Sequence, residues 1–145
     1  MKTRYFGEMD YAEDAVIRIP AGIPGFPGDS GYLLIQFPTQ YPLVYLQSLQ
    51  RTDVCFAALP VRVASPGYEL TLSEEDARAL GVGTRPKIGD EVLCLAFLAA
   101  EESGIPTANL KAPVVIRIQT RMAAQCLNGD GNYLCRHPLE EVVTA

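Results

Sequence analysis

The sequence predicts a mainly β, single-domain protein: a small antiparallel, barrel-like sheet with one or two short helices. Three observations favour this class. About eight or nine short segments alternate in polarity or are wholly apolar, and glycine, proline or asparagine separates them. Only one stretch carries the signals that begin a helix. The 145 residues suit one domain, and no repeat or linker divides 1–145. Short strands of this kind build antiparallel barrels and sandwiches.

The first part of the chain is expected to be nearly all strand. One glycine- and proline-rich stretch, from Gly22 to Gly28, must be irregular. Within it, Phe26 is expected to close the edge of the core rather than bind a ligand. The expected strands cover 3–11, 14–19, 32–37, 43–49 and 54–59.

The middle of the chain is expected to hold a short strand and then a short helix. Tyr68 to Leu72 is the candidate strand. Ser73 is a good N-cap, and Asp76 stands at the capping-box position three residues later. Gly81 then ends a helix of about two turns.

The last third is expected to form further strands. Residues 91–100 are apolar on both faces, which is typical of a central strand. Pro113 is tolerated at the start of a strand, so 114–119 and 121–127 are predicted to pair as antiparallel neighbours. Asn128-Gly129-Asp130-Gly131 contains two hairpin-type dipeptides. A helical turn is expected over His137 to Val143.

Composition excludes several classes of function. No apolar run approaches the roughly 18 residues of a membrane span, and the N-terminus does not resemble a secretory signal. We therefore expect a cytoplasmic protein without membrane contact. The formal net charge is −5, with the basic residues scattered singly. Direct nucleic-acid binding is not expected, whereas a basic protein partner would be attracted.

The four cysteines lack the spacing of a disulfide framework or a zinc site. Reduced thiols are therefore expected. The residues are Cys55, Cys94, Cys126 and Cys135.

Catalytic motifs are incomplete. Gly28-Asp29-Ser30-Gly31 spells the surroundings of a serine nucleophile, but the only histidine is His137 and just 29 residues precede Ser30. A turn is the favoured interpretation. Cys135 and His137 would project to one side of a strand, yet no third group is apparent. We predict no enzyme activity and no cofactor; a hydrolase using Ser30 or Cys135 is the alternative to test.

A calcium loop is also incomplete. Asn128, Asp130 and Asn132 alternate like the first ligands of an EF-hand. The sixth and twelfth positions of such a loop would hold Tyr133 and Leu139 in place of glycine and glutamate, so no metal is predicted.

Acidic residues gather in two places. Either group fits a solvated surface, and acids at a helix N-terminus need no partner because they favour the helix dipole. Either group could instead meet a basic protein. The first comprises Glu69, Glu74, Glu75 and Asp76, and the second Glu8, Asp10, Glu13 and Asp14.

Four short motifs give the chain a resemblance to the bacterial flagellar assembly factor FliW family. G-I-P-G-F begins at Gly22, Y-L-Q-S at Tyr45, T-A-N-L-K-A-P-V-V-I at Thr107 and Y-L-C-R-H-P-L at Tyr133. They occur in the order and roughly the spacing of that family. The chain departs from the family pattern at Arg117, at Leu59-Pro60 and over Arg121 to Ala124, so no family contact is carried over to the connection at Arg121 to Ala124.

The resemblance implies a non-enzymatic, β-barrel-like regulator with two protein partners. One is the translational repressor CsrA, a small basic RNA-binding dimer that represses flagellin mRNA; the other is flagellin, whose level sets how much FliW opposes CsrA. An orphan FliW-like domain with another partner is the alternative. We hypothesise that Glu69 and Glu74 to Asp76 face CsrA. Four polar motif residues are left open between buried hydrogen-bonding supports and partner contacts: Gln47, Asn109, Arg136 and His137.

Overall fold

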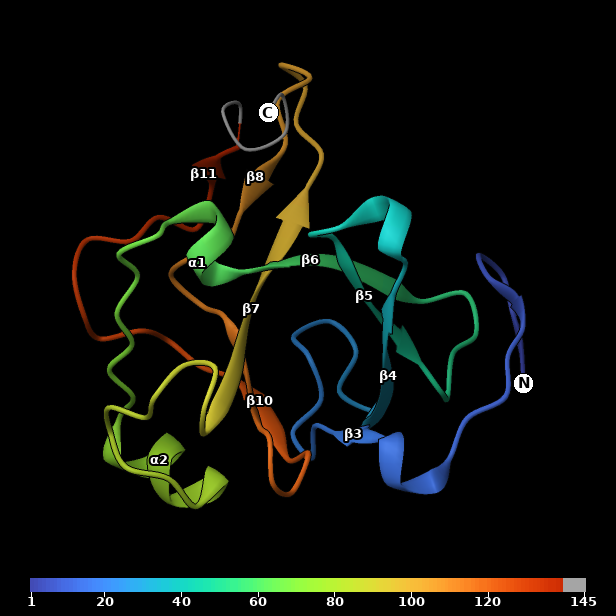
Figure 1. The fold of residues 1–145 in the computed structure, drawn as a ribbon, viewed down its shortest axis with the longest axis horizontal. Helices are drawn as coiled ribbons and strands as arrows, with labels where there is room; N and C mark the ends of the chain where they lie inside the picture. Colours follow the sequence, from blue (N-terminus) through green and yellow to red (C-terminus); the bar gives the residue numbers. More distant parts are fainter. Residues whose placement is uncertain (140–145) are drawn as a thin grey trace.

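The computed structural model describes residues 1–139, and its main element is one curved antiparallel sheet (Figure 1). The strand order is β10-β9-β7-β6-β5-β4-β3, and β7 also pairs with β8, which pairs with β11. A separate hairpin joins β1 and β2. The strands are β1 Lys2–Thr3, β2 Gly7–Glu8, β3 Ile17–Arg18, β4 Gly31–Gln36, β5 Val44–Ser48, β6 Cys55–Pro60, β7 Val92–Ala99, β8 Thr107–Ala108, β9 Val114–Arg117, β10 Ala123–Gln125 and β11 His137–Pro138.

The sheet curls into an open barrel. Its two end strands, β3 and β10, do not pair along their length, but an isolated bridge joins Arg18 to Met122 at one point. There the amide of Arg18 donates to the carbonyl oxygen of Arg121 over 3.0 Å. The predicted mainly β, barrel-like class is confirmed, although the barrel is not closed by strand pairing.

Two α-helices and two 3-10 turns complete the fold. They are α1 Val61–Ala64, α2 Glu74–Leu80, η1 Glu13–Ala15 and η2 Pro38–Gln40. The two short α-helices agree with the prediction, although α1 was not foreseen from the sequence. It is a single apolar turn with no side-chain cap, so no start signal marks it. No helix within 1–139 is long and apolar enough to cross a membrane.

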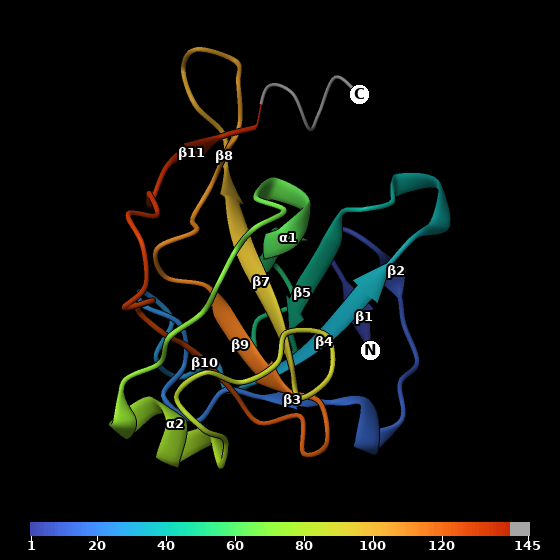
Figure 2. The same cartoon turned by 60° about the vertical axis from the view of Figure 1, so that its left-hand side comes forward.

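Apolar side chains fill both faces of the curved sheet. The concave face buries residues such as Tyr32, Leu46 and Ile116. Most of the convex face is covered by α1, α2 and the segment before α2 (Figure 2). The β1–β2 hairpin covers the rest through Phe6, whose ring lies 5.3 Å from that of Tyr45. The curved sheet is therefore a packed scaffold, and the polar side chains are attached to it.

Most central strands lie where the sequence places them. The strands predicted at 32–37, 43–49, 54–59 and 91–100 correspond to β4, β5, β6 and β7. The strands predicted at 114–119 and 121–127 are the antiparallel pair β9 and β10, shortened by a turn in which Arg121 has a φ of 61°. Phe26 is half-buried against Phe56 at the core edge, with 5.5 Å between the rings.

Several predicted elements are wrong. Residues 3–11 form a hairpin instead of one strand, because the Thr3 hydroxyl accepts from the Phe6 amide and donates to the Gly7 carbonyl, which fixes a turn. In 14–19, η1 replaces the start and only β3 is strand. Asn128 to Gly131 does not connect paired strands. The helical turn predicted at 137–143 begins as strand β11, and its remainder from 140 lies outside the described residues.

Candidate functional site

The acidic end of α2 is built as the sequence suggests. The hydroxyl oxygen of Ser73 accepts a hydrogen bond from the Asp76 amide over 3.1 Å, and Gly81 ends the helix with a φ of 74°. Glu74 and Glu75 are exposed, and Asp76 is half-buried. Within residues 1–139 none of the three carboxylates forms an ion pair. They therefore present uncompensated negative charge at one end of the molecule.

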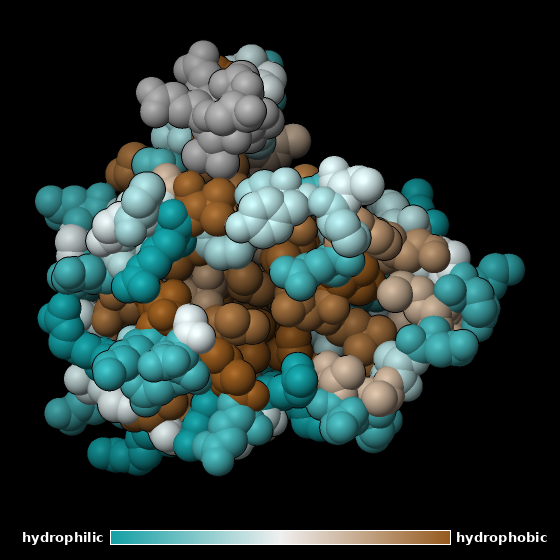
Figure 3. All heavy atoms as spheres, viewed as in Figure 1, coloured by the Kyte–Doolittle hydropathy of each residue, from teal (hydrophilic) through white to brown (hydrophobic). Residues whose placement is uncertain are grey.

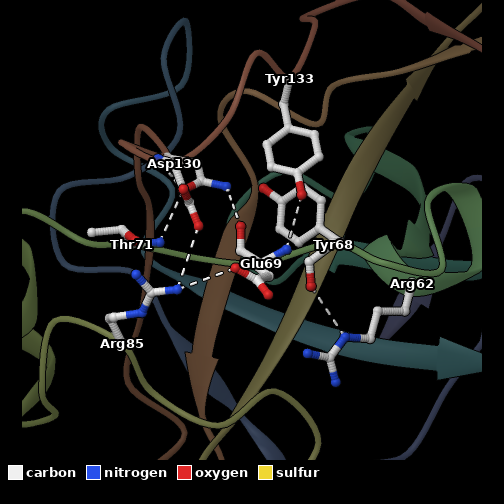
Figure 4. A network of polar contacts seen from close by, with 8 residues as sticks. Arg62, Tyr68, Glu69, Thr71, Arg85, Asp130 and Tyr133 are labelled. Carbon is white, nitrogen blue, oxygen red and sulfur yellow. Dashed lines mark hydrogen bonds and ion pairs between the residues drawn. The ribbon is translucent and has the colours of Figure 1, made fainter.

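Glu69 lies in a different electrostatic setting. Its carboxylate is 3.2 Å from the guanidinium of Arg85, which also reaches Asp130 at 3.6 Å (Figure 4). The side chains of Glu69 and Arg85 are both more than half exposed, so solvent screens the pair. Since its charge is compensated within the chain, Glu69 contributes less to an acidic surface than Glu74 and Glu75 do.

Asn128 fixes the segment that carries Glu69. The side-chain amide is fully buried; it donates to the Glu69 carbonyl over 2.8 Å and accepts from the Thr71 amide over 2.9 Å. The Gly129 amide also donates to the Thr71 carbonyl. These bonds take the place of a strand ladder, so the predicted strand at Tyr68 to Leu72 is wrong: the segment is extended but has no partner strand.

Two tyrosines complete this network. The Tyr133 hydroxyl accepts from the Glu69 amide over 3.0 Å, and its ring packs 4.3 Å from that of Tyr68. The buried Tyr68 hydroxyl donates to the Leu110 carbonyl over 2.6 Å. Sequence inspection missed Asn128 and Tyr133 as supports, because their partners are more than fifty residues away in the chain.

A groove of about 460 Å³ runs beside this network. Arg62, Arg85 and Lys87 line it together with Glu69 and Asp90. Arg62 donates through Nε to the Tyr68 carbonyl over 3.3 Å, and in Figure 4 Arg62 and Arg85 lie on opposite sides of Glu69. The surface around Glu69 therefore mixes both signs of charge, in contrast to the first turn of α2.

Gln47 and Asn109 are placed as structural supports. Gln47 in β5 is fully buried, and its Nε2 lies within hydrogen-bond distance of the carbonyl oxygens of Ser48, Thr52 and Val54. Asn109 is half-buried, and its side-chain oxygen accepts from the Ala112 amide over 2.9 Å. That bond holds the chain just before Pro113 and β9.

Arg136 forms a two-pronged ion pair with Glu101. Both guanidinium–carboxylate distances are 2.7 Å, and the Thr107 hydroxyl donates to the same carboxylate over 3.0 Å. The hydrogen bonds from Arg136 and then Thr107 lower the pKa of Glu101 below its usual value. His137 is half-buried in β11, where it pairs with Ala108 in β8. Glu101 thus holds the segment that leads into β11, a role that the sequence did not predict.

The predicted site residues do not form one site. Figures 1 and 2 both place β11 and α2 at opposite ends of the molecule. Arg136 and His137 therefore lie far from Glu74, Glu75 and Asp76, while Gln47 and Asn109 sit within the frame. These candidate residues therefore cannot all belong to one contact surface.

The residues of the serine motif are committed to a turn. The buried Asp29 carboxylate accepts from the Ser48 hydroxyl over 3.2 Å. Ser30 immediately precedes β4, which starts near β3, at the opposite end of the molecule from His137 in β11. Serine and histidine are thus far apart in the fold.

The asparagine-rich loop supports the fold, and two of the cysteines pack in the core. The Asn128 side-chain oxygen, which would be a calcium ligand in an EF-hand, accepts hydrogen bonds from the backbone amides of Thr71 and Asp130. In the described part of the chain, no group of three histidine, cysteine or acidic residues is arranged to hold a metal ion. All four cysteines are free thiols; Cys94 and Cys126 are buried, and that burial raises the pKa of each to about 12.

Fold and geometry together define a small β-barrel-like protein whose charged candidate residues lie on separate surfaces of a hydrogen-bonded sheet. The family model described as FliW protein matches residues 1–139. The chain belongs to the FliW family, a family of non-enzymatic flagellar assembly factors.

Individual relatives agree over nearly the whole length. The flagellar assembly factor FliW of Thermoanaerobacter pseudethanolicus is 32% identical over 147 residues, which cover 100% of this chain and 96% of the relative. That of Bacillus subtilis is 29% identical and covers 94% of both chains. A crystal structure of the flagellar assembly factor FliW matches with a TM-score of 0.83 and 27% identity, covering 96% of this chain and 95% of that one.

Proposed function

We propose that this protein is a cytoplasmic regulator of flagellin synthesis that binds the repressor CsrA and flagellin. Binding to CsrA relieves repression of flagellin mRNA, and binding to flagellin couples that relief to the flagellin level. The observation that carries the proposal is the match to the FliW family over residues 1–139, supported by the same fold in a FliW crystal structure.

The first turn of α2 is the surface proposed for CsrA. Glu74 and Glu75 are exposed and form no ion pair within 1–139, so their field extends into solvent. A basic dimer would be attracted there, and the added negative potential would disfavour RNA on the repressor. Glu69 lies at the margin of this surface, since Arg85 compensates its charge.

The four polar motif residues receive separate roles in this proposal. Gln47 and Asn109 act as supports because their side chains bond backbone groups of their own frame. His137 begins β11 at the other end of the molecule, and Arg136, which directly precedes it, is engaged by Glu101. We propose that these two position β11 and do not contact CsrA.

Titration calorimetry with CsrA from the same organism at two salt concentrations tests the proposal. Binding at micromolar or tighter affinity that weakens with salt is expected. The double variant Glu74→Lys/Glu75→Lys should weaken binding by at least about tenfold, because two attractive charges become repulsive. The matched control is Asp10→Lys/Asp14→Lys, which makes the same charge change in the other acidic group.

Three outcomes separate the alternatives. Equal loss in both double variants would mean that only net charge matters and would refute the placement at α2. Absence of CsrA binding by the folded wild-type protein would refute the CsrA half and favour flagellin alone or another partner. Reaction with a serine- or thiol-directed probe, abolished by changing Ser30 or Cys135, would instead support the hydrolase alternative.

A further inference from the structure

The concave face of the sheet is not completely covered. Strand alternation and register place Leu34, Phe56 and Phe97 on the same side as the buried Leu46, which pairs with both Leu34 and Phe56. Those three side chains and Leu93 remain only half-buried. The rings of Phe56 and Phe97 stack with 4.9 Å between centroids. We call Leu34, Phe56, Leu93 and Phe97 the open face.

A hollow of about 160 Å³ is formed next to the open face. Its apolar lining comes from four strands, the start of α1 and the loop before β7. Figure 3 shows a continuous hydrophobic area in the middle of the view, in the region where Figure 1 draws β6 and β7. Concave apolar sites of this kind are suited to receive apolar side chains of a binding partner. The lining includes Leu34, Val44, Pro60, Ile88, Leu93 and Leu95.

The charged side chain that lines this hollow is that of Arg62. Arg62 also lines the neighbouring groove, where Lys87 lies together with the acidic Glu69 and Asp90. Neither Arg62 nor Lys87 forms an ion pair among residues 1–139. A basic partner approaching the hollow would be repelled, whereas a carboxylate next to apolar anchors would be attracted. The hollow itself, with Arg62 as its charged lining residue, thus has the opposite charge preference from the first turn of α2.

We infer that the open face and its hollow dock flagellin and not CsrA, through a flagellin segment that combines apolar side chains with a carboxylate for Arg62. The inference rests on the proposed function in that both proteins are taken as partners. It assigns them by chemistry: the basic dimer meets the carboxylates of α2, and the segment with apolar anchors meets the hollow. A substitution on one surface should therefore abolish binding of one partner and leave binding of the other unchanged.

Two substitutions test this assignment. Leu93→Asp places a charge in the apolar lining, and Arg62→Glu reverses the charge at its edge. Each should weaken flagellin binding by at least about tenfold and leave CsrA binding within about twofold of wild type, because buried anchors and their charged neighbours dominate interface energies. Arg62→Gln should be intermediate, since it keeps an N–H donor for the Tyr68 carbonyl. Arg4→Glu, an exposed position on the β1–β2 hairpin, is the matched charge control.

Calorimetry with purified monomeric flagellin and with CsrA gives the readout, and thermal unfolding confirms that each variant is folded. If Leu93→Asp fails to fold, the exposed Arg62 variants decide. Wild-type flagellin affinity in folded Arg62→Glu, or an equal loss in Arg4→Glu, would overturn the assignment while leaving the proposed function intact. Loss of CsrA binding in the Arg62 variants would also overturn it. No binding of flagellin by the wild-type protein would instead refute the flagellin half of the proposed function.

Discussion

Asn128 occupies the position beside Thr71 that a neighbouring strand would otherwise fill. The Asn128 side-chain oxygen accepts a hydrogen bond from the Thr71 amide, and its side-chain nitrogen donates one to the Glu69 carbonyl. Asn128 thus supplies two hydrogen bonds of the kind that a neighbouring strand would make. The segment it holds leads directly into Ser73 and α2. The acidic end proposed for CsrA therefore depends on a residue far away in the sequence.

Replacing Asn128 should be costly. Asn128→Ala leaves two partly buried backbone groups, the Thr71 amide and the Glu69 carbonyl, without these partners, at a cost of about 1–3 kcal/mol each. We expect a loss of about 2–4 kcal/mol in the free energy of unfolding, measured with urea. Asn132→Ala, at an exposed position in the same loop, is the control and should change stability by less than about 0.5 kcal/mol. Equal effects at both positions would contradict the role given to Asn128.

Gly81 should resist substitution for two separable reasons. Its φ of 74° disfavours any side chain by about 1–2 kcal/mol, and a Cβ there would lie 2.7 Å from Nη1 of Arg117. Gly81→Ala should therefore lower stability, and less so in an Arg117→Ala background, where the close approach is removed. A double-mutant cycle by urea unfolding measures the difference. Strict additivity of the two changes would show that only backbone strain matters.

Two buried tyrosines should respond oppositely to loss of the hydroxyl. The Tyr32 hydroxyl has no hydrogen-bond partner within 1–139, and burial raises its pKa to about 12, so the group stays neutral. Tyr32→Phe should be neutral or stabilising by up to about 1 kcal/mol. Tyr68→Phe removes the bond to the Leu110 carbonyl and should cost about 1–2 kcal/mol. Thermal unfolding of both variants decides; destabilisation by Tyr32→Phe would contradict the first expectation.

The ion pair of Arg136 and Glu101 should make stability depend on pH on the acid side. Because the pKa of Glu101 is lowered in the folded protein, its contribution is present above its unfolded pKa, about 4.3, and is lost as pH falls through the lower folded value. Wild type should therefore lose more stability than Arg136→Met between about pH 5 and pH 3. Melting temperatures across this range test the expectation, and parallel curves would refute it.

The central strands were predictable because their signal is local. Alternating or continuous apolar side chains identify β4 to β7 and β9 without knowledge of their neighbours. The helix α2 was equally clear, because Ser73 and Gly81 bond groups only a few residues away. In these segments local preference and tertiary packing agree.

The misses around the candidate site share a cause in contacts between distant segments. The segment from Tyr68 to Leu72 has the composition of a strand, but its partner is a side chain 57 residues beyond Thr71. The ion pair of Glu101 joins it to Arg136, 35 residues away, so no local pattern in the sequence indicates it. Glu69 likewise seemed free until Arg85 was found beside it. Charge clusters seen in a sequence do not show which charges are already paired.

The single bridge between Arg18 and Met122 has a consequence for how the protein folds. It links strands near the two ends of the chain, so it closes a very long loop and brings almost no further pairing with it. The hairpin-connected strands β4, β5 and β6 can form earlier, because their contacts are local. This seam is therefore expected to form last and to open first, and the Arg18 amide should exchange its hydrogen with solvent faster than the amides of β5.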